Sequence, residues 1–162
     1  MAKTFRPSLF LRMGNKIVTF LLRAGVNMGN TTLLTVRGRK SGQPRTTPVT
    51  QVERDGERWL IAPYGSVNWV RNLRAVGEAT LTRGRRTKHI SVVELSAQEA
   101  APILKHTLAI APSFLLAYFD VMVGSSLADV ESEAPRHPVF LVKNLSSQQS
   151  TNKNASVEKA IL

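Results

Sequence analysis

The sequence predicts an α+β domain whose mostly antiparallel sheet can close into a small barrel. Three observations predict it. Apolar and β-branched segments flank two turn signals, Asp55-Gly56 and Gly84, as the strands of hairpins do. An amphipathic segment precedes these strands, and a capping box at Ser96 opens a helical region after them. At 162 residues the chain has the length of one domain.

Residues 8–24 predict the first helix, because apolar side chains recur at spacings of three and four while cations occupy the other face. The apolar set is Phe10, Met13, Ile17, Phe20 and Leu21, and the polar set is Arg12, Lys16, Thr19 and Arg23. Two interpretations stay open: a helix in the interface of an anionic membrane, or a cover over the protein's own core. We expect residues 1–24 to be part of, or attached to, a domain at 25–143. No apolar stretch is long enough to span a membrane.

Five strands and one short helix are predicted between residues 31 and 95. The strands are Thr31–Arg37, Val49–Arg54, Glu57–Ala62, Ala79–Arg83 and Arg85–Leu95. The first of them ends in a polar turn that contains two glycines and a proline. Between the two hairpins, Asn68–Val76 is a predicted helix that Gly77 stops.

The second half of the chain is predicted to be mostly helical. Ser96 and Glu99 form a capping box, so a helix begins at Ala97 and runs to about Leu108. Pro112 precedes a further helix. The remaining predictions are that helix at Ser113–Val123, a polar connection at Gly124–Pro138, a last strand at Val139–Val142 and a disordered tail at 144–162.

The charge of the chain is concentrated in its first third. Of the formal net charge of +11, residues 1–52 contribute nine cations and no acid, and the rest contributes 13 cations against 11 acids. A segment with this much positive charge needs an anionic partner, which can be nucleic acid, an acidic membrane or a phosphorylated or polycarboxylate ligand. The absence of cysteine excludes disulfides and thiolate catalysis and permits a reducing cytoplasm.

No residue pattern for metal binding or side-chain hydrolysis is present. His89, His106 and His137 lie far apart in the sequence, so we expect no metal site. The chain contains no nucleophile elbow and no Walker loop. Its carboxylates are few and dispersed, which argues against paired acid–base catalysis.

The segment Arg37–Pro48 combines features of an anion site. Gly38 and Gly42 let backbone N–H groups approach a ligand. Cations and hydroxyls accompany them at Arg39, Lys40, Arg45, Ser41, Thr46 and Thr47. A solvated hairpin turn is the alternative interpretation.

Two further patterns admit competing interpretations. Arg37-Gly38-Arg39-Lys40 and Arg83-Gly84-Arg85-Arg86 resemble arms that enter a DNA minor groove, but few aromatics and no recognition helix accompany them. In residues 62–77, Trp69 lies on one helical face with Asn72 and Leu73, suited either to stacking on a flat heterocycle or to the core.

Two segments lie in register with a known family. The first is Gly38-Arg39-Lys40-Ser41-Gly42-Gln43-Pro44-Arg45-Thr46-Thr47-Pro48, and the second, some twenty residues later, is Trp69-Val70-Arg71-Asn72-Leu73. With His137-Pro138-Val139-Phe140 as a similar last strand, they resemble the deazaflavin-dependent nitroreductase/quinone reductase family. The resemblance spans about residues 10–143. It implies a split β-barrel like that of FMN-binding proteins and the use of the deazaflavin coenzyme F-420.

The resemblance also implies a site. Because that coenzyme carries a phosphodiester and an oligoglutamate tail, its groove is expected to be basic. The residues implied for phosphate and tail are Arg39, Lys40, Ser41, Gly42 and Arg45, continued by Thr46, Thr47 and Pro48. Those implied to border the ring are Ile61, Ala62, Pro63, Tyr64 and Gly65, with Asn68, Trp69, Asn72 and Leu73 closing the site. The coenzyme performs the hydride transfer, so the protein needs only to bind, orient and exclude water.

The sequence departs from the nitroreductase branch of this family at two places. That branch has a serine where this chain has Pro63, and it carries tyrosines shortly before the last strand, whereas Val121–Arg136 has none. The proton donor is therefore unassigned, with Tyr64 and Tyr118 as candidates, and nitro-reducing activity is not carried over.

We expect an F-420-dependent reductase that gives a hydride to an apolar acceptor such as a quinone or another activated alkene. We expect it in the cytoplasm, with peripheral contact of residues 8–24 on the inner membrane face, as a monomer or homodimer. The alternative is a lipid- or FMN-binding module without turnover, and a nucleic-acid-binding module is third.

Overall fold

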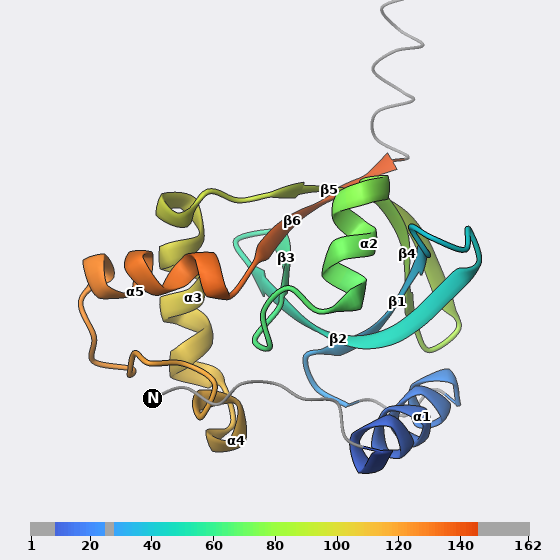
Figure 1. Ribbon diagram of the computed structural model, residues 1–162, viewed down its shortest axis with the longest axis horizontal. Helices are drawn as coiled ribbons and strands as arrows, with labels where there is room; N and C mark the ends of the chain where they lie inside the picture. Colours follow the sequence, from blue (N-terminus) through green and yellow to red (C-terminus); the bar gives the residue numbers. More distant parts are fainter. Residues whose placement is uncertain (1–8, 25–27, 146–162) are drawn as a thin grey trace, which may run out of the picture.

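Six antiparallel strands close into a barrel in the computed structural model, which describes residues 9–24 and 28–145 (Figure 1). The strand order around the barrel is β1-β2-β3-β6-β5-β4. The strands are β1 Thr31–Arg37, β2 Pro44–Arg54, β3 Glu57–Ile61, β4 Glu78–Arg83, β5 Arg86–Glu94 and β6 Val139–Asn144. The helices are α1 Leu9–Arg23, α2 Asn68–Val76, α3 Ala97–Ile110, α4 Ser113–Leu116, α5 Leu127–Glu133 and the 3-10 turn η1 Ala134–Arg136. The predicted α+β class and barrel are confirmed.

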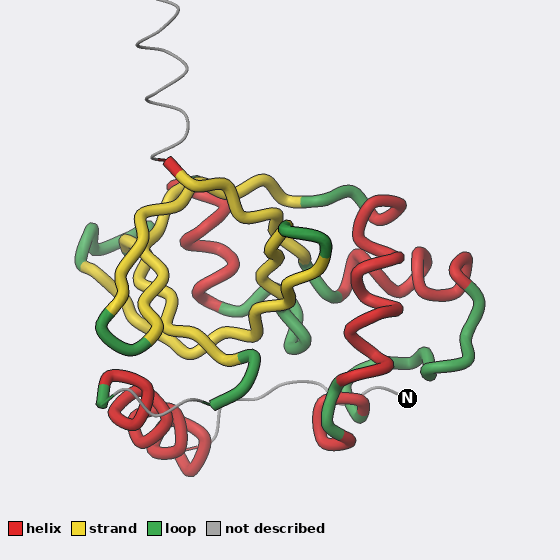
Figure 2. The backbone as a smooth tube through the Cα atoms, turned by 180° about the vertical axis from the view of Figure 1, so that it is seen from behind, coloured by secondary structure: helices red, strands yellow, loops and turns green. Residues whose placement is uncertain are grey.

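The barrel interior and α2 share one apolar core. Side chains alternate between the two faces of a strand, so every second residue points inward. The inward set includes Leu34, Val36, Val49, Leu60, Leu81, Ile90 and Phe140. Val70 and Leu73 of α2 join it with no solvent exposure, and both Figure 1 and Figure 2 show α2 within the outline of the ring of strands. The helix therefore seals one end of the barrel.

A second core lies between the outer face of the barrel and the helices that follow β5. Trp59 and Ile61 of β3 contribute to it from the barrel, and Leu104 of α3 and Val130 of α5 contribute from the helices. The capping box of α3 forms as predicted, with the Ser96 hydroxyl accepting from the Glu99 amide. These helices stand beside the barrel in Figure 2 and leave its ends uncovered.

Helix α1 lies along β1, β2 and β4 and packs through Leu22, which is 2% exposed. Ile17 and Phe20 face solvent, at 58% and 70% exposure. The side chains of Phe10, Arg12 and Met13 lie outside the described part of the chain. Among the described residues, no helix has both the length and the apolarity that crossing a membrane requires.

Local turn signals predict the hairpins correctly. Asp55 and Gly56 both have positive φ, at 53° and 78°, the conformation of a two-residue hairpin turn. Gly77 ends α2 in the left-handed conformation as predicted, donating its N–H to the Leu73 carbonyl. β2, however, begins at Pro44 rather than Val49. Pro48 is tolerated because β3 pairs with β2 only from Thr50 onward, so one edge of β2 is free there.

The helix predicted over 113–123 is wrong beyond Leu116. The Asp120 amide donates to the Glu133 carboxylate instead of to a helical carbonyl, and Phe119 turns into the outer core. The polar connection contains helix α5, whose capping box joins Ser126 and Asp129. Residues 146–162 of the predicted tail lie outside the described residues.

Candidate functional site

The turn between β1 and β2 is held closed by its own backbone. The Gly38 amide donates to the Gln43 carbonyl at 2.9 Å, and the Gly42 amide donates to the Gly38 carbonyl at 2.8 Å. Gly42 has φ +67°, and a Cβ on Gly38 would lie 2.9 Å from the Ser41 hydroxyl. Both glycines therefore serve the closure of the turn with their amides. What the turn offers to a ligand is its exposed side chains, above all that of Lys40.

Asn72 of α2 joins this turn to the sealed end of the barrel. Its side chain is 5% exposed, and its Oδ1 accepts from the Arg39 amide at 3.2 Å and from the Arg39 Nη1 at 2.8 Å. A guanidinium carries five N–H groups, so these bonds orient Arg39 and leave donors for a ligand. Residues that lie 33 positions apart are thereby brought together.

The other predicted residues of α2 divide between core and surface. Leu73 is fully buried, and the half-buried Trp69 packs its ring 5.9 Å from that of Phe140. Asn68 is exposed in the first turn, where Val67 provides no side-chain cap. The first amides of α2 thus lack a side-chain acceptor at the end of the helix nearest to residues 62–67.

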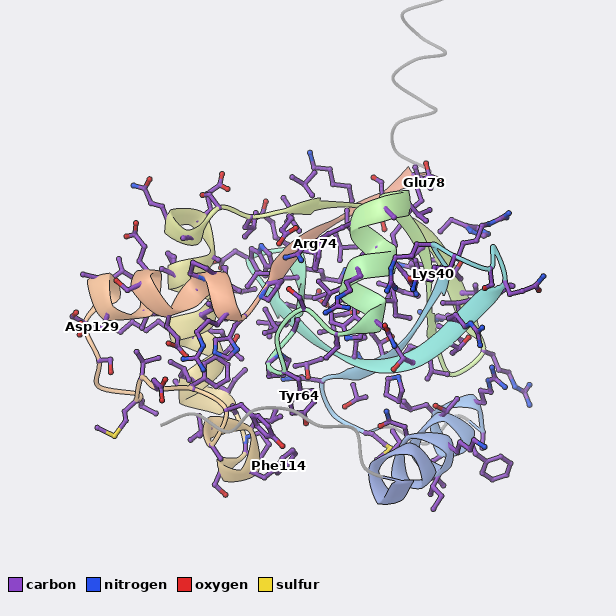
Figure 3. The ribbon with its side chains drawn as sticks, viewed as in Figure 1. Lys40, Tyr64, Arg74, Glu78, Phe114 and Asp129 are labelled. Atoms are coloured by element: carbon purple, nitrogen blue, oxygen red, sulfur yellow. The ribbon has the colours of Figure 1, made fainter. Side chains whose placement is uncertain are left out.

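The loop after β3 is anchored to the segment before β6. The Ala62 amide donates to the Pro138 carbonyl at 2.9 Å, and Gly65, with φ +81°, packs against the Arg136 carbonyl. The Pro63 carbonyl accepts from His137 Nδ1 at 2.9 Å. In Figure 3 the labelled Lys40, in the turn after β1, and Tyr64, in the loop after β3, lie on either side of α2.

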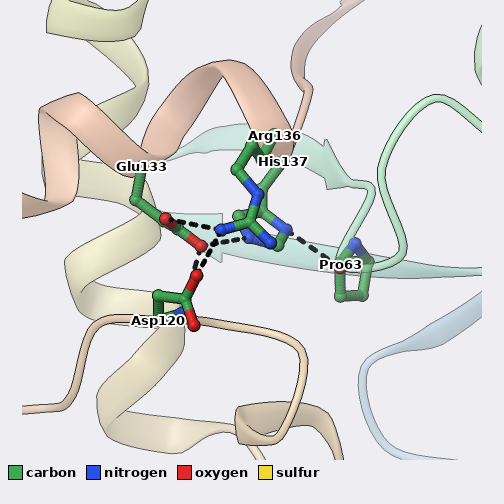
Figure 4. A network of polar contacts seen from close by, with 5 residues as sticks. All are labelled: Pro63, Asp120, Glu133, Arg136 and His137. Atoms are coloured by element: carbon green, nitrogen blue, oxygen red, sulfur yellow. Dashed lines mark hydrogen bonds and ion pairs between the residues drawn. The ribbon is translucent and has the colours of Figure 1, made fainter. Parts of the chain in front are cut away.

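His137 is the centre of a buried polar network that the sequence did not reveal (Figure 4). It is 3% exposed, stacks on Phe119 and places Nε2 2.9 Å from Glu133 Oε1. Because the Pro63 carbonyl only accepts, Nδ1 carries a proton and donates to it. Burial lowers the pKa of His137, against the opposing hydrogen bond from Glu133.

Arg136 and Asp120 complete the network. Arg136 Nη1 donates to Asp120 Oδ2 at 2.6 Å and to Glu133 Oε2 at 3.2 Å. The Asp120 amide donates to Glu133 Oε1 at 3.1 Å, so the carboxylate has partners on both oxygens. The network fixes His137, and His137 in turn fixes the loop that the resemblance assigns to the coenzyme ring.

Tyr64 and Tyr118, the two candidate proton donors, lie in contact. Their ring centroids are 4.7 Å apart in an edge-to-face arrangement. Burial and then the neighbouring Tyr118 raise the pKa of Tyr64, so its hydroxyl keeps its proton at neutral pH. Nothing local in the sequence joins these residues, which lie on a loop after β3 and beyond α4.

The strand residues of the implied site point in two directions. Thr47 lies opposite Leu34 and Arg45 opposite Val36, on the inner face of the barrel. Thr46 faces outward and shares a hydrogen bond of 2.8 Å with the Thr35 hydroxyl. Pro48 is on that outer face too. In the described part of the chain, no group of three acidic or histidine side chains is placed to hold a metal ion.

Residues 22–121 match the sequence profile described as F-420H(2)-dependent quinone reductase, which is more than half of the chain. No curated protein matches this chain. The matched range includes the turn, α2 and both tyrosines, whereas His137 and Glu133 lie beyond it.

Several solved structures are similar to this chain. A chain described as a domain-swapped dimer is 22% identical, covers 85% of this chain and 100% of its own, and has a TM-score of 0.53. A structure described as the F-420-H2-dependent reductase FDR-A is 23% identical, with coverage of 70% and 94% and a TM-score of 0.49. A putative 5-nitroimidazole antibiotic resistance protein from Bacteroides thetaiotaomicron is 14% identical, with coverage of 80% and 78% and a TM-score of 0.48.

Proposed function

This chain belongs to the F-420H(2)-dependent quinone reductase family, and from that premise we propose that it reduces an apolar acceptor such as a quinone. Membership makes it an oxidoreductase that uses the deazaflavin coenzyme F-420. The reduced coenzyme supplies the hydride. The chain's own part is to bind and orient the coenzyme, to keep water from the ring and to supply a proton to the acceptor.

The hydrogen bonds between Arg39 and Asn72 are the observation that carries the proposal. They hold a cationic turn against the sealed end of the barrel, near the loop 62–65. The proposed binding residues for phosphate and tail are therefore Arg39, Lys40 and Arg45. The donor set fits an anionic coenzyme, because Arg39 and Lys40 in the turn and Arg45 at the start of β2 are cations and residues 37–48 contain no carboxylate.

The proton is proposed to come from Tyr64. Reduction of a quinone to a hydroquinone takes up a hydride and a proton, and a tyrosine whose pKa is raised holds that proton at neutral pH. Tyr118 lies against the Tyr64 ring and positions it. The carbonyl of Pro63, held by His137, fixes the backbone next to Tyr64.

The test is a titration of the purified protein with the coenzyme, followed by ring fluorescence. Lys40→Gln with Arg45→Gln is expected to weaken binding about tenfold or more at low ionic strength, and less at high salt. Arg54→Gln with Arg85→Gln is the matched control, because it removes two cations from other turns. No fluorescence change up to on the order of 100 μM coenzyme would contradict the proposal.

We also propose that α1 rests on an anionic membrane surface. Ile17 and Phe20 form an exposed apolar ridge, and the helical spacing places Lys16 and Arg23, four residues before and three after Phe20, along one edge of that ridge. An apolar ridge flanked by cations suits the interface of an acidic bilayer, where apolar acceptors dissolve. Packing through Leu22 keeps the helix on the barrel at the same time.

Flotation with phosphatidylglycerol vesicles tests this contact. Ile17→Ser with Phe20→Ser is expected to abolish flotation. Val93→Ser with Ile110→Ser removes exposed apolar side chains elsewhere and is expected to float like the wild type. If both double variants float equally, the membrane contact is contradicted, and α1 only covers the core of the protein.

A further inference from the structure

The end of the barrel opposite α2 contains a cavity of about 330 Å³. Its lining residues come from β1 to β5 and are Thr32, Gln51, Glu53, Arg58, Leu81, Arg83, Arg86 and Lys88. None of them belongs to the site proposed for the coenzyme. We call Arg58, Arg83, Arg86, Lys88 and Glu53 the basic cup.

The strand register explains why these side chains converge. Along each strand the cup residues alternate with outward residues and continue the row of core residues. Glu53 continues the row of Val49, Arg58 precedes Leu60 by two, and Lys88 precedes Ile90 by two. The positions that are apolar in the middle of the barrel are thus charged at this end, and they point into its mouth.

The cup contains four cations and one carboxylate. Arg83 and Arg86 lie directly opposite each other across β4 and β5, a pairing of like charges that disfavours a sheet. Glu53 lies opposite Arg58 and is the single carboxylate. Within the described residues, Arg58, Arg86 and Lys88 form no ion pair.

One of the cations is held in place. The Arg83 Nη2 donates to the Gly29 carbonyl at 3.0 Å, and Gly29 lies just before β1. At the neighbouring position the Thr32 hydroxyl donates to the Thr82 carbonyl at 3.1 Å. The hairpin Arg83-Gly84-Arg85-Arg86, one of the two arginine-rich segments of the sequence, is therefore part of a structured wall.

We propose that the basic cup binds a small polyanion with two or more phosphate or carboxylate groups, at a site separate from that of the coenzyme. The cavity has the volume of about ten water molecules, which suffices for an anion the size of pyrophosphate. Because the cations face into the mouth of the barrel, they suit a compact anion better than the extended backbone of a nucleic acid. The register places the two hairpins at the far end of β1 from the turn that contains Lys40.

The test is calorimetric titration of the full chain with inorganic pyrophosphate. One-to-one binding is expected, and Arg58→Gln with Arg86→Gln is expected to weaken it about tenfold or more, because two charge-assisted contacts are lost. The control is Arg54→Gln with Arg85→Gln, which takes the same charge from the same two hairpins but from positions outside the cavity. This control is expected to bind within about twofold of the wild type.

Four outcomes overturn the proposal: no binding of pyrophosphate, equal loss in both double variants, release of pyrophosphate by a short DNA duplex that binds with steep salt dependence, or competition between coenzyme and pyrophosphate. The last outcome would make the cup part of the coenzyme site. Retention of pyrophosphate binding by Lys40→Gln with Arg45→Gln supports two separate sites. A failure of coenzyme binding alone would contradict the proposed function and not the cup.

Discussion

The two ends of the barrel differ in what their inward-facing positions contain. Where β1 ends, Val70 and Leu73 of α2 fill the opening and pack against apolar inward residues, while the inward-facing Arg45 lies exposed at the rim. Where β1 begins, no described helix enters, and the inward residues are those of the basic cup. An inward position is therefore apolar only where another element excludes water from it. The sealed end provides a base for the turn that contains Lys40, and the open end leaves Arg58, Arg86 and Lys88 without ion pairs within the described residues.

The largest expected effect is the loss of a core side chain at the sealed end. Leu73→Ala should lower the free energy of unfolding by about 2–5 kcal/mol, because the cavity that it leaves is closed. Leu81→Ala, at the edge of the open cavity, should cost less, since water can enter the space. Urea denaturation of both variants measures the difference. Equal losses would show that the two ends are sealed alike.

The next effect concerns the contact that joins the sealed end to the turn. Asn72→Ala removes the acceptor for two Arg39 donors and should cost about 1–3 kcal/mol of stability. It should also weaken coenzyme binding, because the turn is no longer held. Arg39→Gln keeps the backbone bond to Asn72 and should cost less stability. Unchanged coenzyme affinity in Asn72→Ala would show that the turn is ordered without α2.

How much of this the sequence predicts depends on how local each cause is. The turns at Asp55 and Gly77 follow from single residues, and the predictions there are confirmed. The helix over 113–123 fails because the amide of Asp120 bonds a carboxylate 13 residues away. Helix α5 had a local signal, the pair Ser126 and Asp129, that marks its start.

The site shows the same division. The turn and α2 are readable as motifs, and Arg39 and Asn72 do meet. The bond from His137 to Pro63 spans 74 residues and has no local signature. The basic cup also escapes the sequence, because only the register shows which charged residues face inward. The assignment of residues to the coenzyme site remains a prediction, and so does the oligomeric state, monomer or homodimer.

A smaller expected effect is the dependence of the free energy of unfolding on pH that results from the burial of His137. Its pKa is lowered in the folded protein, so the unfolded chain binds more protons near and below the usual value of about 6.5. Stability is therefore full above that pH and falls as the pH decreases, by at most about 1.4 kcal/mol per pH unit for one proton. Denaturation between about pH 7.5 and 5.5 should show this slope.

His137→Gln should flatten the slope, and His89→Gln, which removes an exposed histidine, is the matched control variant. NMR titration of the wild-type histidine rings provides a second measurement that needs no variant. An His137 ring that titrates above its usual value would mean that Glu133 outweighs burial. The loop at Pro63 would then be held by an imidazolium.

The smallest expected effect concerns the open end of the barrel, and it is a gain of stability where the preceding variants lose stability. Arg86→Gln relieves the repulsion across from Arg83, so Tm should rise by roughly one or two degrees at low salt and by less at high salt. Arg85→Gln, in the same turn but outside the cavity, should raise it less. A fall in Tm with Arg86→Gln would mean that the cup's cations stabilise the barrel mouth through contacts of their own. The charges would then be structural, and the reason to expect a polyanion at this end would be lost.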